Sequence, residues 1–98
     1  MIVKNLETLH LNLYGNYFDQ IESGEKKEEY REITPYWNRR ITNVINSGVK
    51  TITFSNGYAK NRRQMVVELK SIERGIGNPN WGAPQHCVYI LKLGNKLN

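Results

Sequence analysis

The sequence predicts a single α+β domain in which a small mixed or closed β-sheet carries two helices at its edge. The length of 98 residues, with 39% hydrophobic side chains, suits one compact core. The patterns follow the order strand, helix, strand, helix and then three strands, and antiparallel signals dominate the second half. This order argues against a doubly wound parallel sheet. We expect one domain over residues 1–98, with a core of about 7–94.

The first predicted strand covers residues 7–13, where three leucines alternate with polar residues. A short helix is expected next, with Asn16 as its N-cap, Asp19 three residues on, and Gly24 as its stop. The apolar face of this helix is formed by Tyr17, Phe18 and Ile21. The charged segment 26–33 is then expected to be extended.

A second helix is predicted from Thr34, as N-cap, and Pro35, at the first helical position, to Ser47–Gly48. Its expected apolar face consists of Trp37, Ile41, Val44 and Ile45. Three further strands are predicted over residues 51–54, 64–72 and 88–93. A loop as long as 73–86 in so small a domain usually has a function or covers another part of the protein, and the tail 94–98 is expected to fray.

The net charge of +5 is unevenly distributed. Residues 1–33 hold four basic and seven acidic side chains, a net −3, whereas residues 34–98 hold ten and two, a net +8. A basic surface of this kind attracts phosphate chains through counterion release, although modest basic charge also serves solubility alone.

Several classes of protein are disfavoured by the composition. No apolar run reaches the roughly 20 residues of a membrane helix, and the N-terminal stretch, which contains Glu7 and His10, does not resemble a secretory signal. One cysteine and two histidines are too few for a disulfide framework or a structural zinc site. We therefore expect a cytoplasmic protein without a membrane partner, metal or cofactor.

The densest charge cluster, residues 23–32, contains the candidate site. In an extended strand Glu29 and Arg31 share one face and can pair, and Lys26, just after Gly24, can reach the same cleft. A lysine beside a carboxylate is the minimum for proton transfer. Burial would lower the pKa of this lysine and the carboxylate would raise it. The alternative is a solvated strand of salt bridges.

Basic and aromatic side chains of the second half form a candidate nucleic-acid surface. They are Arg39, Arg40, Tyr58, Lys60, Arg62, Arg63 and Trp81. Cations near an exposed ring suit a single strand, with charges on phosphates and a ring under a base. The alternatives are a solvated loop, and for Trp81 a packing role at one end of the barrel. We interpret His10 and His86 as hydrogen-bonding residues, with a proton carrier as the alternative, and Cys87 as a small buried hydrophobe.

The motif Gly24-x-Lys26-x-x-Glu29-x-Arg31, placed after a strand and a short helix, resembles the signature of ASCH domains, which are members of the PUA-like superfamily. The wider run from His10 to Trp37 is similar to the short stand-alone ASCH proteins of bacteria and their phages. Further residues of the pattern are Phe54 to Tyr58, Trp81-Gly82 and Ile90 to Gly94. The resemblance extends over roughly Leu9 to Gly94.

This resemblance implies a PUA-like small β-barrel of about five to six mixed strands with two flanking helices. It also implies that the motif side chains line a cleft for RNA or a nucleotide. One ASCH branch is an acetylcytidine amidohydrolase, which uses the motif lysine, a threonine three residues later and a distant glutamate. Lys26 matches that lysine, Glu29 stands at the threonine position, and Glu68 is the nearest candidate for the distant glutamate.

Two functions follow as hypotheses, and we favour the first. In an RNA- or nucleotide-binding module, Lys26 and Arg31 hold phosphate, and Glu29 orients Arg31 or accepts a base amino group. In a hydrolase acting on RNA or a modified nucleoside, Lys26 is the acid/base group or nucleophile and Glu29 its proton partner, with Tyr30 or Arg31 steadying charge. A third interpretation is a protein partner that docks through Trp81 and the long loop.

Overall fold

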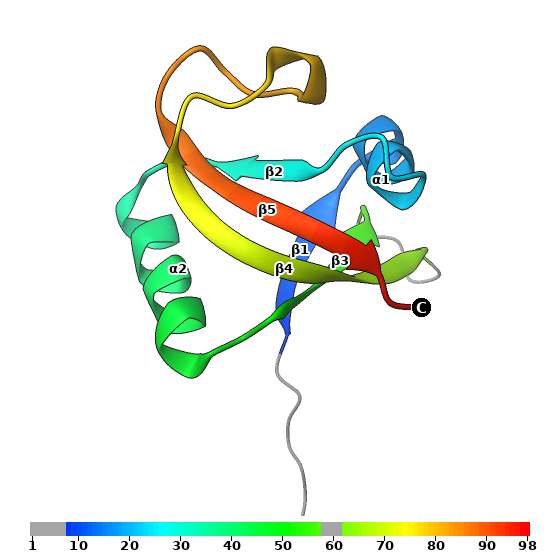
Figure 1. Ribbon diagram of the computed structural model, residues 1–98, viewed down its shortest axis with the longest axis horizontal. Helices are drawn as coiled ribbons and strands as arrows, with labels where there is room; N and C mark the ends of the chain where they lie inside the picture. Colours follow the sequence, from blue (N-terminus) through cyan, green and yellow to red (C-terminus); the bar gives the residue numbers. More distant parts are fainter. Residues whose placement is uncertain (1–7, 58–61) are drawn as a thin grey trace, which may run out of the picture.

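The computed structural model describes residues 8–57 and 62–98 and has the predicted α+β architecture. A five-stranded mixed sheet curls into a half-barrel, and two helices lie beside it (Figure 1). The elements are β1 (Leu9–Leu13), α1 (Gly15–Glu22), β2 (Glu28–Arg31), α2 (Pro35–Ser47), β3 (Thr51–Asn56), β4 (Gln64–Gly75), the 3-10 helix η1 (Pro79–Trp81) and β5 (Val88–Lys96). Within these residues no helix is long and apolar enough to cross a membrane.

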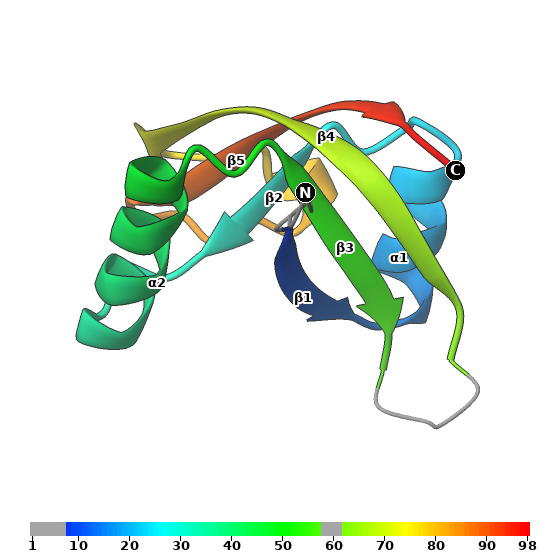
Figure 2. The ribbon, with the colours of Figure 1, turned by 90° about the horizontal axis from the view of Figure 1, so that it is seen from below.

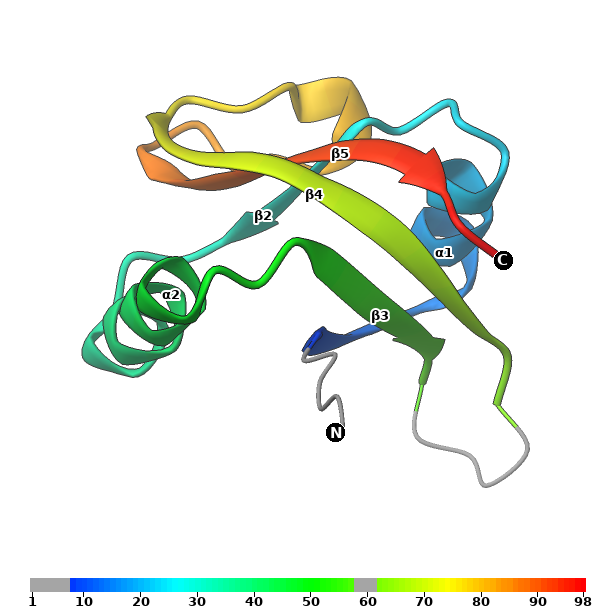
Figure 3. The same cartoon turned by 60° about the horizontal axis from the view of Figure 1, so that its bottom comes forward.

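The strand order β1-β3-β4-β5-β2 leaves β1 and β2 as the two edges of the sheet. Only the β1–β3 pair is parallel, and the other three pairs are antiparallel. The β4–β5 register shifts between Val67 and Leu69 and again between Leu69 and Ser71. Such irregularities bend a strand and increase its twist. The long strands β4 and β5 therefore curve, and the sheet turns its two edges toward the same side (Figures 2 and 3).

The hydrophobic core fills the hollow side of the sheet. The alternating leucines of β1 are buried, as predicted. The helix α1 contributes Phe18 and Ile21, and α2 contributes Ile41 and Val44. The two helices stand at opposite ends of the half-barrel, so each closes one end of this core (Figure 2).

The boundaries of α2 follow the predicted capping chemistry. The Thr34 hydroxyl accepts a hydrogen bond of 3.2 Å from the Trp37 amide, and Pro35 begins the helix. At the other end Gly48 adopts a left-handed conformation with φ of 71°, which glycine reaches without steric cost.

Three predictions about local packing were wrong. Asn16 is not the N-cap of α1, because the helix begins at Gly15 and the Gly15 amide donates to the Asn56 side chain of β3. Ile45 is 62% exposed and lies off the buried face of α2. Cys87 is exposed, since it precedes the first residue of β5.

The last two strands are longer than predicted. The predicted loop begins at Glu73, yet β4 runs to Gly75, because residues 73–75 pair with β5. The predicted tail begins at Gly94, yet β5 continues to Lys96, which pairs with Val67. Both extensions depend on partners distant in the sequence. They leave a loop over residues 76–87 that contains η1.

Candidate functional site

Three charged side chains meet beside β2, as the strand geometry predicts. Glu29 and Arg31 lie on the same face of β2, and the Nη2 atom of Arg31 is 2.7 Å from Oε2 of Glu29. Lys26, in the turn after α1, places Nζ 3.3 Å from the other oxygen of that carboxylate. We call Lys26, Glu29 and Arg31 the charged triad.

The ammonium group of Lys26 is enclosed. The residue is only 2% exposed, and Nζ donates to the backbone carbonyls of Glu28 at 2.7 Å and Trp81 at 2.8 Å. With the Glu29 carboxylate, three acceptors surround the three N–H groups of this ammonium. Lys26 therefore attaches the loop over residues 76–87 to the start of β2.

Burial lowers the pKa of Lys26 below 10.5, and the attraction of Glu29 opposes this shift only in part. The rings of Tyr30 and Tyr17 lie 4.7 Å and 5.4 Å from Nζ, measured to their centroids. These cation–π contacts replace some of the solvation that the ammonium loses. Burial therefore disfavours the charged form of Lys26, whereas the acceptors and the two rings around Nζ favour it.

Arg31 connects the two edges of the half-barrel. Besides its pair with Glu29, its Nη2 atom donates to the backbone carbonyl of Asn12 on β1 at 3.1 Å. Its Nε atom is buried without a hydrogen-bond partner among the described residues. The guanidinium is therefore held in a fixed place with part of its donor capacity unused.

A second arginine from α2 approaches the same edge. Arg40 donates from Nη2 to the His10 carbonyl of β1 at 3.3 Å. The Cζ atoms of Arg31 and Arg40 each lie 5.1 Å from the ring centroid of Trp37, and Arg40 Cζ lies 5.8 Å from that of Tyr36. Two guanidinium groups thus share one indole ring.

These side chains surround an open hollow of about 230 Å³ between β1, β2 and α2. We call it the arginine hollow. Its charged and aromatic lining consists of His10, Tyr14, Arg31, Tyr36, Trp37 and Arg40. Tyr14 is 62% and Tyr36 52% exposed. The Glu29 carboxylate pairs with Arg31 and balances only one of the two guanidinium charges, those of Arg31 and Arg40. An anion would therefore be stabilised in this hollow.

The other predicted nucleic-acid contacts do not all gather at this hollow. Arg39 is exposed on α2 and does not line it. Arg63 pairs with Asp19 and Glu22 of α1, and Arg62 is exposed beside it. Trp81 is half-buried in η1, on the other side of Lys26. Tyr58 and Lys60 lie outside the described residues.

His86 and Glu68, the candidate distant glutamate, form hydrogen bonds away from the charged triad, whereas His10 lines the arginine hollow. His86 approaches Glu32, with 2.8 Å between Nε2 and Oε1. The Glu68 carboxylate accepts from the Asn95 amide at 2.8 Å, at the β4–β5 pair. Among residues 8–57 and 62–98, no cluster of three or more histidine, cysteine, aspartate or glutamate side chains could hold a metal ion.

Sequence reasoning missed the aromatic part of the hollow. Trp37 packs against the core, as its assignment to the apolar face of α2 predicts, but it is only half-buried and its ring also contacts the two arginines. The spacing of Trp37 and Arg40, three residues apart on a helix, was the available signal. Tyr14 offered none, because its position depends on how β1 meets α2.

No protein-family model matches the chain, and neither the curated proteins nor the solved structures compared with it gave a match.

Proposed function

We propose that this protein is an ASCH-type module that binds single-stranded RNA in the arginine hollow. The observation that carries the proposal is the pair of guanidinium groups, Arg31 and Arg40, which both contact the Trp37 ring and line one open hollow with the exposed rings of Tyr14 and Tyr36. Phosphate and base are the two parts of a nucleotide, and these side chains match both.

Arg31 and Arg40 are the phosphate ligands in this proposal. Guanidinium groups bind phosphate oxygens through forked N–H donors, and Arg31 is already oriented by Glu29 and by the β1 edge. Lys26, whose ammonium is enclosed, acts as a positioning residue for β2 and the loop. The overall charge of +5 adds long-range attraction for RNA.

The exposed rings of Tyr14 and Tyr36 provide stacking surfaces for a base. Stacking on an aromatic side chain stabilises a bound base by about 1–3 kcal/mol. We propose that Arg39 and Arg62 contact the strand beyond the hollow, that Tyr58 and Lys60, which lie outside the described residues, also bind RNA, and that the protein acts in the cytoplasm. Docking of a protein through Trp81 and its loop stays a prediction.

Binding of a fluorescent single-stranded RNA oligonucleotide, followed by anisotropy at low and moderate salt, tests the proposal. We expect Arg40→Gln to weaken binding about tenfold or more, because a charge-assisted contact is lost. The matched variant Lys70→Gln removes the same charge from exposed β4, away from the hollow, and should have a small effect. Absence of affinity at low salt, or equal losses in both variants, would refute the site.

A hydrolase is the second candidate, and one observation favours it. The lowered pKa of Lys26, with the Glu29 carboxylate 3.3 Å away, is the arrangement of an acid/base pair. Against it, all three N–H groups of Lys26 already face acceptors. Incubation of the protein with RNA and with acetylcytidine, in the absence of metal, tests the hydrolase. Turnover that is lost in a folded Lys26→Met variant would support it, and absence of conversion of both compounds would exclude it.

A further inference from the structure

A second hollow lies on the other side of Arg31 and Trp37. It measures about 260 Å³ and lies between β2, α2 and the loop over residues 76–87. We call it the loop hollow. Gly82 and Pro84 of the loop form one wall, and Glu32 supplies a carboxylate.

Arg31 and Trp37 line both hollows, so this stacked pair is a shared wall. Each hollow alone is smaller than the roughly 300 Å³ at which ligand sites usually begin. The two hollows adjoin each other across the Arg31–Trp37 pair, so a ligand larger than either hollow could occupy both.

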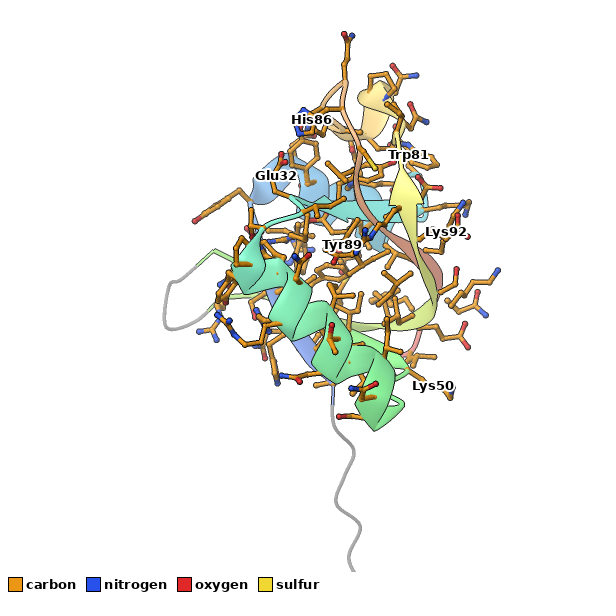
Figure 4. All side chains as sticks on the ribbon, turned by 90° about the vertical axis from the view of Figure 1, so that its left-hand side faces the viewer. Glu32, Lys50, Trp81, His86, Tyr89 and Lys92 are labelled. Carbon is orange, nitrogen blue, oxygen red and sulfur yellow. The ribbon has the colours of Figure 1, made fainter. Side chains whose placement is uncertain are left out.

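The two halves differ in charge. Arg40 makes the arginine hollow cationic, whereas Glu32 makes the loop hollow partly anionic. Glu32 is about half exposed and lies beside His86 (Figure 4), with 2.8 Å between its Oε1 atom and Nε2 of that ring. A carboxylate accepts hydrogen bonds and repels phosphate, so the loop hollow suits the edge of a base better than the strand's backbone.

We propose that the two hollows hold two consecutive nucleotides of a single-stranded RNA, with the phosphate that links them on Arg31. Glu32 then accepts from the exocyclic amino group of the base in the loop hollow. Uracil lacks this group, and two carbonyl oxygens that a carboxylate repels flank its single N3–H donor, so the loop hollow selects against it. This inference rests on the proposed RNA binding and adds the length and base preference of the site.

Titration calorimetry with adenosine monophosphate, the dinucleotide ApA and the trinucleotide ApApA tests the length of the site. We expect ApA to bind about tenfold more tightly than the mononucleotide, because a second base is enclosed. The trinucleotide should gain at most about threefold more. Charge alone predicts that adenosine monophosphate binds more tightly than ApA, since a terminal monophosphate carries more negative charge than one phosphodiester.

A comparison of ApA with UpU tests the base preference. We expect about fivefold tighter binding of ApA, and near-equal binding in Glu32→Gln, because a carboxamide both donates and accepts. Glu25→Gln removes the same charge from an exposed residue outside both hollows and should keep the preference.

The possible failures are distinguishable. If neither these short nucleotides nor a longer single-stranded RNA binds, the proposed function fails, and this inference fails with it. If the longer RNA binds but ApA is no tighter than the monophosphate, only the two-nucleotide site is overturned. If ApA is tighter but Glu32→Gln keeps the base preference, the role of Glu32 is overturned.

Discussion

Replacement of Lys26 by methionine should destabilise the fold far more than loss of a surface lysine. The variant keeps the aliphatic stem but removes two hydrogen bonds and the ion pair with Glu29, which leaves the carbonyls of Glu28 and Trp81 without this donor. Removal of one partner of a buried ion pair costs about 3–5 kcal/mol. Arg31 still pairs with Glu29, so we expect the lower end, about 3 kcal/mol.

Urea denaturation followed by tryptophan fluorescence measures this loss. For a domain of this size, 3 kcal/mol corresponds to a decrease in Tm of roughly 12–24 °C. Lys27→Met, at the exposed neighbouring lysine, should change the free energy of unfolding by at most about 0.5 kcal/mol. A loss below about 1 kcal/mol for Lys26→Met, or equal losses for the two variants, would refute the structural role assigned to Lys26.

Glu29→Gln, combined with Lys26→Met, isolates the charge interaction. In the double variant no uncompensated carboxylate remains in the buried site. The free energy of unfolding of the double variant should therefore fall by about 1–2 kcal/mol less than the sum of the decreases in the two single variants. Additive losses would show that the ammonium and the carboxylate do not stabilise one another.

Two further predictions concern Tyr30 and the loop that covers it. Burial raises the pKa of Tyr30 to about 12, so its neutral form stabilises the fold fully below pH 10, and this stabilisation is lost as the pH rises toward 12. Tyr30→Phe removes hydrogen bonds to Glu28 and from the Asn78 amide, so it should cost about 1–2 kcal/mol at neutral pH, and this difference from the unmodified protein should shrink near pH 11 in urea denaturation. A constant difference would contradict the assignment. A Cβ at Gly77 would lie 2.3 Å from the Tyr30 ring, so Gly77→Ala should lower the free energy of unfolding by about 1–3 kcal/mol. Gly75→Ala is the control: its Cβ would lie 3.5 Å from the nearest atom, so it should cost much less. Equal losses in the two variants would argue against the close packing of this loop.

Local sequence chemistry was sufficient for much of the fold. The alternation of β1 and the caps of α2 each depend on residues within a few positions of one another, such as Thr34 with Trp37. Strand ends were less predictable, since Gly75 is extended only because Val88 pairs with it. The predicted N-cap of α1, Asn16, was wrong for the same reason, because the hydrogen-bond partner of the Gly15 amide comes from β3, which is distant in the sequence.

The sequence by itself determined which side chains of β2 share a face, and so brought Glu29 and Arg31 together, because alternation along a strand is a local property. Only the tertiary structure decided what surrounds them. The carbonyl of Trp81 reaches Lys26 across 55 positions of the chain, and that of Asn12 reaches Arg31 across 19. Such contacts exist only once the sheet has curled and turned β1 toward β2, and the arginine hollow is a product of that curvature.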